Sequence, residues 1–290
     1  MLSEFKDYVI RNKLNVYGIV VIKDGIKVAE YHFAPEERRK LYSVTKSITS
    51  TAIGIAIAEG YFSLNDSILK LLEEYIPKDA SQNHLDNLNK VTVERLLTMS
   101  IKDYNIGRLA CDNWLNYILS IPLPNVEERV FTYSNLTAYL AGVIVEKITK
   151  INMMDYLNTR LFEPLGIKNV ECEYSPEGYF YGATGMKLTI NELGRFGQLY
   201  LQEGYYNGKQ LLTKEWVNSA IKKQIETREG GYGYYFWIHQ VHSYRASGMR
   251  GQASIVIPDK NAVIAVMSDL DDHDTEEMKQ YIWDTVYPKL

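Results

Sequence analysis

The chain has 290 residues, and at the usual length of about 150 residues per domain this predicts one large domain or two. The formal net charge is −4, from 32 Lys and Arg against 36 Asp and Glu. This near balance argues against binding to nucleic acid or to an anionic membrane surface. Hydrophobic residues make up 46% of the chain, which excludes wholesale disorder.

The termini and the cysteines indicate the compartment. The first 30 residues mix charged with apolar side chains and contain no apolar stretch followed by a cleavage site, so no signal peptide is predicted. No apolar run approaches the ~20 residues of a membrane span. The two cysteines, Cys111 and Cys172, do not form a disulfide framework. We therefore expect a reduced, cytoplasmic protein without a membrane span, although removal of a leader would leave the same pattern.

The N-terminal segment predicts a hairpin and then a helix. The runs Tyr17–Ile22 and Ile26–Phe33 are rich in β-forming residues and flank Asp24-Gly25, a typical hairpin turn. The stretch from Ser43 to Glu59 is almost free of charge after Lys46 and stops at a glycine. Its length favours a buried helix over a strand.

The middle of the chain, from about Asp66 to Ile167, is dominated by helical patterns. A polar stretch, Asp79–Lys90, and two prolines separate these patterns. The predicted helices are Ile68–Tyr75, Thr92–Met99, Cys111–Leu119, Leu136–Thr149 and Met153–Phe162.

The C-terminal part predicts helices and strands together. A capping box at Thr189–Glu192 begins one helix, Thr213 caps a second, and Asp274–Glu277 caps a last one. The strand candidates are Tyr234–Val241, Tyr244–Ser247, Gln252–Pro258 and Ala262–Ser268. These elements predict an α+β fold in which helices flank one antiparallel sheet. The sheet domain comprises residues 1–65 and 169–290, and an all-helical domain, residues 66–168, is inserted into it.

The first candidate for chemistry is Ser43-Val44-Thr45-Lys46. Four serines are followed three positions later by a lysine, but only this pair begins a long apolar helix, where both side chains lie on one face. A helix N-terminus offers N–H groups that suit an oxyanion. Apolar surroundings favour the neutral amine that accepts a proton. The alternative is that Ser43 is only a helix cap and Lys46 a surface lysine.

The second candidate is Tyr133-Ser134-Asn135, which links a proline-containing segment to a long apolar helix. A nearby lysine cation would lower the pKa of the Tyr133 phenol, which would then act as a general base and later as a general acid. The alternative is an ordinary turn tyrosine, one of 23 in the chain.

The third candidate is the segment 245–252 (RASGMRGQ) between two predicted strands. Glycines at a strand edge allow a substrate to approach the backbone, and a free N–H there would complete an oxyanion hole with Ser43. A glycine-rich hairpin turn is the alternative.

The order of these three elements resembles the class C β-lactamase superfamily. That superfamily also includes D-alanyl-D-alanine carboxypeptidases, related carboxylesterases and 6-aminohexanoate-dimer hydrolase. The resemblance extends from about Tyr17 to the C-terminus and implies a β-lactamase/transpeptidase-like fold. The similar stretches are Leu41–Asp66, Val91–Ser100, Phe131–Leu140, Leu161–Gly166 and Gly185–Gly204.

The resemblance also implies roles. Ser43 would be the acylated nucleophile, Lys46 its proton partner, and Tyr133 the general base that later protonates the leaving group. Asn135 would donate or accept a hydrogen bond at the acyl side of the substrate or at Lys46. The backbone N–H groups of Ser43 and Met249 would form the oxyanion hole. Ser247, Gly248 and Met249 would line the substrate site.

One departure from the family pattern bears on the substrate. In β-lactamases and carboxypeptidases the third motif is Lys-Thr-Gly or His-x-Gly, and its cation helps to bind the substrate carboxylate. The matching place here reads Ala246-Ser247-Gly248. This favours the esterase and amidase members, with Arg245 or Arg250 as candidates to replace the cation.

We therefore predict a serine hydrolase that cleaves a small-molecule or short-peptide ester or amide, with no cofactor. The oligomeric state stays open. The alternatives are a true β-lactamase or D-alanyl-D-alanine carboxypeptidase, and a penicillin-binding or sensor module without turnover. No metal site is predicted, because the acidic loop Asp269–Asp274 is typical of helix caps and the histidines lack zinc-ligand spacing. Aromatic residues of Tyr232–Trp237 are expected in the sheet or along the cleft.

Overall fold

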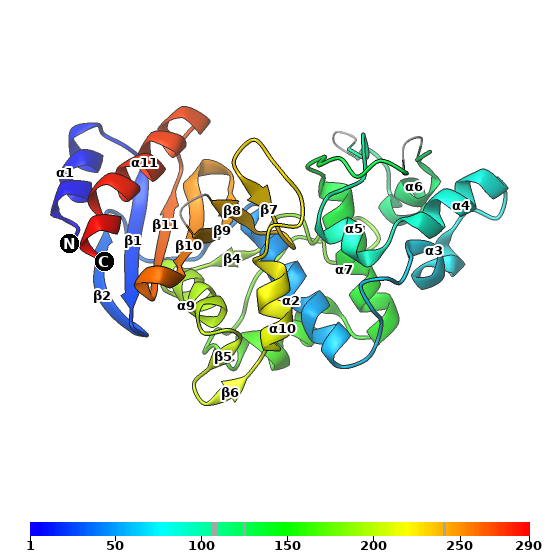
Figure 1. Ribbon diagram of the computed structural model, residues 1–290, viewed down its shortest axis with the longest axis horizontal. Helices are drawn as coiled ribbons and strands as arrows, with labels where there is room; N and C mark the ends of the chain where they lie inside the picture. Colours follow the sequence, from blue (N-terminus) through cyan, green and yellow to red (C-terminus); the bar gives the residue numbers. More distant parts are fainter. Residues whose placement is uncertain (106–108, 124–125, 240–241) are drawn as a thin grey trace.

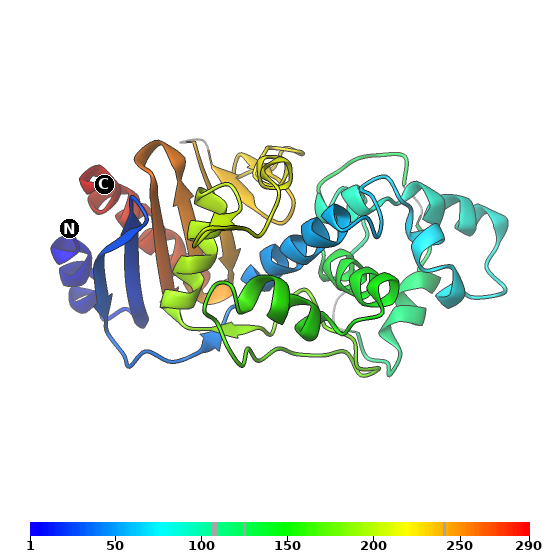
Figure 2. The same cartoon turned by 90° about the horizontal axis from the view of Figure 1, so that it is seen from below.

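A computed structural model describes residues 1–105, 109–123, 126–239 and 242–290. A seven-stranded sheet lies at one end of an elongated molecule, and helices cluster at the other (Figures 1 and 2). The strand order is β2-β1-β11-β10-β9-β8-β7, and neighbouring strands are antiparallel. The strands are β1 (Val16–Lys23), β2 (Ile26–His32), β7 (Gly231–Tyr232), β8 (Trp237–His239), β9 (Ser243–Gly248), β10 (Gln252–Ile257) and β11 (Ala262–Ser268).

Helices cover both faces of the sheet (Figure 2). The terminal helices α1 (Ser3–Arg11) and α11 (Asp272–Thr285) pack on one face. Helix α9 (Ile190–Leu201) packs on the other face, beside α2 (Val44–Ala58). Because side chains of a strand alternate between faces, β1 contributes to both hydrophobic clusters.

Helix α2 connects the sheet to the helical end of the molecule, where it packs against α7 (Asn135–Thr149) (Figure 2). Both helices are buried around most of their circumference. The other helical elements of this part are α3 (Ile68–Leu71), η1 (Glu73–Tyr75), α4 (Gln82–Lys90), α5 (Val93–Leu97), α6 (Trp114–Ser120), α8 (Met153–Leu157) and the π-turn η2 (Asn158–Phe162).

The remaining elements are short. Strands β3 (Arg39–Lys40) and β4 (Lys187–Leu188) pair with each other just before α2 and α9. The others are β5 (Tyr205–Tyr206), β6 (Lys209–Gln210), α10 (Lys214–Ala220) and the 3-10 turns η3 (Met249–Gly251), η4 (Pro258–Lys260) and η5 (Tyr287–Lys289).

The predicted α+β class and its antiparallel sheet are confirmed. The hairpin turns at Asp24-Gly25, and Lys23 pairs with Ile26. The capping box of Thr189 and Glu192 is present, and Thr213 caps α10. The division into residues 1–65 with 169–290 and residues 66–168 stays a prediction.

Three expected elements are wrong in detail. The polar stretch Asp79–Lys90 contains α4, which is capped by Ser81 and buries little besides Leu88. Tyr234–Val241 is not one strand, because a turn separates β7 from β8, and residues 240–241 lie outside the described part of the chain. Helix α11 starts at Asp272, because the Asp271 side chain accepts a hydrogen bond from the Asp274 N–H.

Within the described residues, no helix combines the length and the apolar character needed to cross a membrane.

Candidate active site

Ser43 lies at the N-terminus of α2, after a residue with unusual backbone geometry. Tyr42 has a φ of 48°, in the left-handed region, and turns the chain into the helix. The Ser43 side chain makes no capping hydrogen bond. Among the hydrogen bonds of the described turns and loops, none uses the Ser43 N–H. Ser43 is therefore more than a helix cap: its hydroxyl and its N–H are both available for chemistry.

Lys46 lies one turn further along α2 and is buried, with 1% of its surface exposed. Its Nζ is 3.0 Å from Ser43 Oγ, 2.8 Å from Asn135 Oδ1 and 2.9 Å from the carbonyl oxygen of Ala183. The interpretation of Lys46 as a surface lysine is therefore wrong.

The surroundings of Lys46 favour its neutral form. Burial lowers the pKa of Lys46 to about 7, because no carboxylate accompanies the amine into the apolar interior. Asn135 Oδ1 and the Ala183 carbonyl can only accept hydrogen bonds, so they take the two N–H groups of a neutral amine. The remaining lone pair then faces the Ser43 hydroxyl, which can donate to it.

Asn135 is held by the start of α7. The Ser134 side chain caps this helix by accepting a hydrogen bond from the Leu136 N–H at 3.1 Å. This cap fixes Asn135 in the first turn, with its amide oxygen directed at Lys46. Asn135 was expected to form a hydrogen bond with the substrate or with Lys46, and the structure shows the bond with Lys46.

Tyr133 precedes that cap and reaches Ser43 from the other side. Its hydroxyl is hydrogen-bonded to Ser43, and the Lys46 Nζ lies 4.9 Å from the centre of its ring. The ring stacks on Trp237 at 5.8 Å with an angle of 22° between the planes. Burial raises the pKa of Tyr133 to about 12. The expected lowering by a lysine cation is therefore wrong, since burial disfavours both the phenolate and the ammonium.

The glycine-bearing segment lies directly beside Ser43. A Cβ atom at Gly248 would be 2.2 Å from the Leu41 carbonyl oxygen and 3.1 Å from the Ser43 nitrogen. Only glycine lets the end of β9 approach the start of α2 this closely. Met249 follows immediately, so its backbone and the Ser43 N–H border the same space.

A cleft of about 300 Å³ opens over these groups. Ser43, Tyr133, Ser247, Gly248 and Met249 line it, together with Trp237. The structure thus places the seven predicted residues together, five along the cleft and Lys46 and Asn135 behind Ser43. The C-terminal helix α11 forms another wall through Thr275 and Lys279, which the sequence did not indicate.

The two arginines considered as a replacement cation are both paired. Arg245 lines the cleft and forms an ion pair with Glu229 at 2.5 Å. Arg250 is half-exposed, and its Nε lies 3.6 Å from Asp269. Ala246, between Arg245 and Ser247 on β9, is buried.

Sequence reasoning did not identify the segment 181–183, which forms hydrogen bonds with residues of the site. Besides the Ala183 carbonyl on Lys46, the Gly182 carbonyl accepts a hydrogen bond from Thr49 Oγ1 at 2.8 Å, and the Tyr181 side chain is hydrogen-bonded to Asn135. The segment therefore contacts both helices that carry the site.

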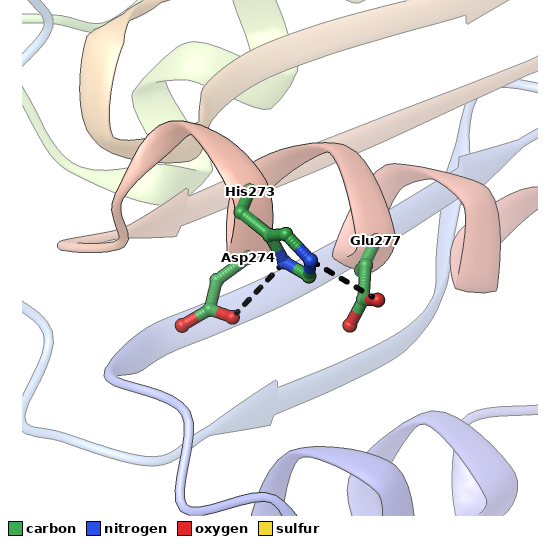
Figure 3. Close-up of side chains that lie close together, drawn as sticks. All are labelled: His273, Asp274 and Glu277. Atoms are coloured by element: carbon green, nitrogen blue, oxygen red, sulfur yellow. Dashed lines mark ion pairs between the residues drawn. The ribbon is translucent and has the colours of Figure 1, made fainter.

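The acidic region near the C-terminus contains a group of possible metal ligands at the surface of α11. Figure 3 shows the His273 ring between two carboxylates, with Nδ1 3.7 Å from Asp274 and Nε2 3.8 Å from Glu277. The carboxylates approach different ring nitrogens of an exposed side chain, an arrangement typical of surface ion pairs. No metal role is assigned to it.

Comparison with known proteins identifies the family of this chain. The family model described as Beta-lactamase matches residues 5–287. The 6-aminohexanoate-dimer hydrolase of Paenarthrobacter ureafaciens is 24% identical, over 89% of this chain and 74% of the relative.

Solved structures share the fold. The octameric penicillin-binding protein homologue from Pyrococcus abyssi aligns with a TM-score of 0.75 and 20% identity, covering 99% of this chain and 77% of that one. A class C beta lactamase from Rhodobacter sphaeroides aligns with a TM-score of 0.76 and 14% identity, covering 96% of each chain. With a family model matched over nearly its whole length and a site built at the expected serine, this chain belongs to the beta-lactamase family.

Proposed function

We propose that the protein is a serine hydrolase that cleaves an ester or amide through an acyl-enzyme on Ser43. The observation that carries this proposal is the buried Lys46 amine, which lies 3.0 Å from Ser43 Oγ while two carbonyl-type oxygens occupy its N–H groups. Such an amine is a general base directed at one hydroxyl.

Acylation begins with transfer of the Ser43 proton to the Lys46 amine. Ser43 Oγ then bonds to the substrate carbonyl carbon, and the carbonyl oxygen becomes an oxyanion beside the N–H groups of Ser43 and Met249. When the tetrahedral intermediate collapses, the bond to the leaving group breaks. Tyr133 donates its proton to that group and regains one from the Lys46 ammonium.

Deacylation reverses these transfers with water as the nucleophile. A water proton passes through Tyr133 to Lys46, and the water oxygen bonds to the acyl carbon. Collapse of this second intermediate breaks the bond to Ser43 Oγ, which takes a proton back from Lys46. The raised pKa of Tyr133 fits this role, because a phenol that stays protonated can donate and relay protons without accumulating as phenolate.

The substrate preference follows from the charge of the cleft. The cation that β-lactamases and carboxypeptidases place in the third motif is replaced by the buried Ala246, and Arg245 is already paired with Glu229. This supports esters and amides as substrates over β-lactams and D-alanyl peptides. The relative named 6-aminohexanoate-dimer hydrolase is in line with this preference.

Labelling with a fluorophosphonate, followed by intact-mass measurement, tests the nucleophile. We expect one adduct on the wild type and none on Ser43→Ala. Ser219→Ala is the matched control, because Ser219 belongs to another copy of the same spacing with Lys222. An adduct that survives Ser43→Ala would contradict the proposal.

A substrate panel then distinguishes the possible activities. Short p-nitrophenyl esters and linear amides should be turned over many times per enzyme molecule. Rapid hydrolysis of a chromogenic cephalosporin or of a D-alanyl peptide would identify a β-lactamase or a carboxypeptidase instead. A penicillin adduct that is never released, without turnover of any ester, would indicate a sensor module.

A further inference from the structure

The cleft above Ser43 contains an ion pair that the chemistry does not use. Arg245 Nη2 lies 2.5 Å from Glu229 Oε2. The Arg245 side chain is 11% exposed, whereas that of Glu229 is 50% exposed. The guanidinium is therefore a fixed part of the cleft wall, and the carboxylate covers it from the solvent side.

Arg245 lies beside the aromatic residues of the cleft. It pairs with Trp237 across β8 and β9, and its guanidinium lies 5.9 Å from the centre of that ring. The same ring stacks on Tyr133. Because side chains alternate along a strand, Arg245 and Ser247 share the face that lines the cleft, and Ala246 points into the interior.

The charges of the cleft balance one another. Its charged lining residues are Arg245, Arg250, Lys279, Glu229, Asp272 and Glu276. Lys279 is paired with Glu276 at 2.6 Å, as Arg245 is with Glu229. Within the described ranges, Glu229 is the only carboxylate that forms an ion pair with Arg245. Glu229 bonds one nitrogen of this guanidinium, so a substrate carboxylate that approaches Arg245 would meet a like charge beside it.

We propose that Glu229 is a specificity-determining residue: its carboxylate binds Arg245 in the cleft wall, so that the cleft selects uncharged substrates over substrates that carry a carboxylate. This inference rests on the proposed function. Replacement of Glu229 by glutamine would keep the shape of the wall and leave the guanidinium charge uncompensated.

Matched pairs of esters measure this selection. Mono-p-nitrophenyl adipate and suberate carry a terminal carboxylate, whereas p-nitrophenyl hexanoate and octanoate have the same acyl lengths without it. The quantity of interest is the ratio of kcat/KM for the charged ester to that for the uncharged ester, corrected for hydrolysis without enzyme. We expect the wild type to prefer the uncharged esters, and Glu229→Gln to raise the ratio about fivefold, the size of one partly exposed ion pair.

Two further variants test whether the change in the ratio comes from the Glu229–Arg245 pair. Glu226→Gln removes an exposed carboxylate of the same segment, one that pairs with Lys223 outside the cleft, and should leave the ratio at the wild-type value. The double variant Glu229→Gln with Arg245→Met should show no rise in the ratio, because it lacks the guanidinium that would bind the substrate carboxylate.

The outcomes separate this inference from the proposed function. A wild type that hydrolyses uncharged esters, combined with an unchanged ratio in Glu229→Gln, overturns the role of Glu229 alone. A wild-type preference for the charged esters overturns it as well. A wild type that hydrolyses none of the four esters contradicts the proposed function and, with it, this inference.

Discussion

Lys46 determines the protonation chemistry of the site, because its amine is buried among neutral partners. The pKa of about 7 places the change from ammonium to amine at neutral pH. Below this pH the ammonium has no lone pair for the Ser43 proton, and above it the amine predominates. The rate of acylation should therefore rise with pH through about 7 and level off above it.

The burst of p-nitrophenolate from an activated ester, followed by stopped flow over a range of pH, measures this rise. Lys46→Arg should show neither the burst nor the rise, since arginine stays protonated. Lys222→Arg, in another copy of the same spacing, should keep the wild-type profile. An acylation rate that is flat across neutral pH would rule out Lys46 as the base.

Tyr133 should matter most where the leaving group needs a proton. An anilide releases an amine that must be protonated, whereas p-nitrophenolate leaves as a stable anion. For Tyr133→Phe we expect kcat/KM on an anilide to fall by about 10²–10⁴-fold, with a smaller loss on a p-nitrophenyl ester of the same acyl group. Tyr117→Phe, on an exposed helix surface, is the control. Equal losses on both substrates would indicate that Tyr133 only shapes the cleft.

The sequence could predict the part of this site that one helix contains. Ser43 and Lys46 lie three residues apart on α2, so helical periodicity alone brings them together. Asn135 lies 89 residues from Lys46, and Ala183 lies 137 residues away. Asn135 could be placed only through the family resemblance, and Ala183 not at all, because a backbone carbonyl leaves no trace in residue type.

At the scale of elements, the site depends on how the segment 181–183 holds α2 and α7 together. Gly182 has a φ of 70°, and a Cβ atom there would lie 2.5 Å from the Ala138 carbonyl oxygen on α7. Its own carbonyl binds Thr49 on α2. The segment therefore fits between the two helices only with glycine at its centre, and the Ala183 carbonyl on Lys46 is positioned by this fit.

Gly182→Ala should consequently lower both the stability and the rate of acylation. Strain at positive φ together with the close contact predicts a loss of about 2–4 kcal/mol in the free energy of unfolding, measured with urea. Gly178→Ala is the matched control: its φ is 92°, but no atom lies within 4 Å of the added methyl group. Gly178→Ala should lower the free energy of unfolding by only about 1–2 kcal/mol and leave the rate of acylation unchanged. Equal effects of the two variants would show that the close fit at Gly182 is unimportant.

Element boundaries could be predicted where a local signal marks them. The Thr189 and Glu192 capping box is visible in four residues and gave the start of α9. Helix α4 has only two apolar residues, Leu85 and Leu88, because it lies at the surface of the helical end and buries only Leu88, so its pattern is too short to predict a helix. The turn between β7 and β8 lies within a run of aromatic residues with high strand propensity, and Tyr235 adopts a φ of 63° that no pattern in this run indicates.

At the scale of the whole molecule, two hydrophobic clusters meet at the sheet. The larger one runs from the α9 face of the sheet through α2 and α7 to the helices between residues 66 and 168. The smaller one lies between the opposite face and the terminal helices, where Tyr8 stacks on Tyr281 at 3.9 Å. Since the larger cluster is continuous, the helical end has no core separate from that of the sheet, whereas the smaller cluster belongs to the sheet end alone.

We therefore expect the sheet and the helical segment 66–168 to unfold in one cooperative transition. Leu97→Ala in α5 and Ile282→Ala in α11 each remove a fully buried side chain, one from each cluster. Each should lower the free energy of unfolding by about 2–5 kcal/mol. In urea, tryptophan fluorescence and far-ultraviolet circular dichroism should report the same single midpoint in both variants. The contradicting result is an unfolding curve with two steps in Leu97→Ala, the second at the wild-type midpoint. It would mean that the helical segment unfolds independently of the sheet, as two separately stable domains would.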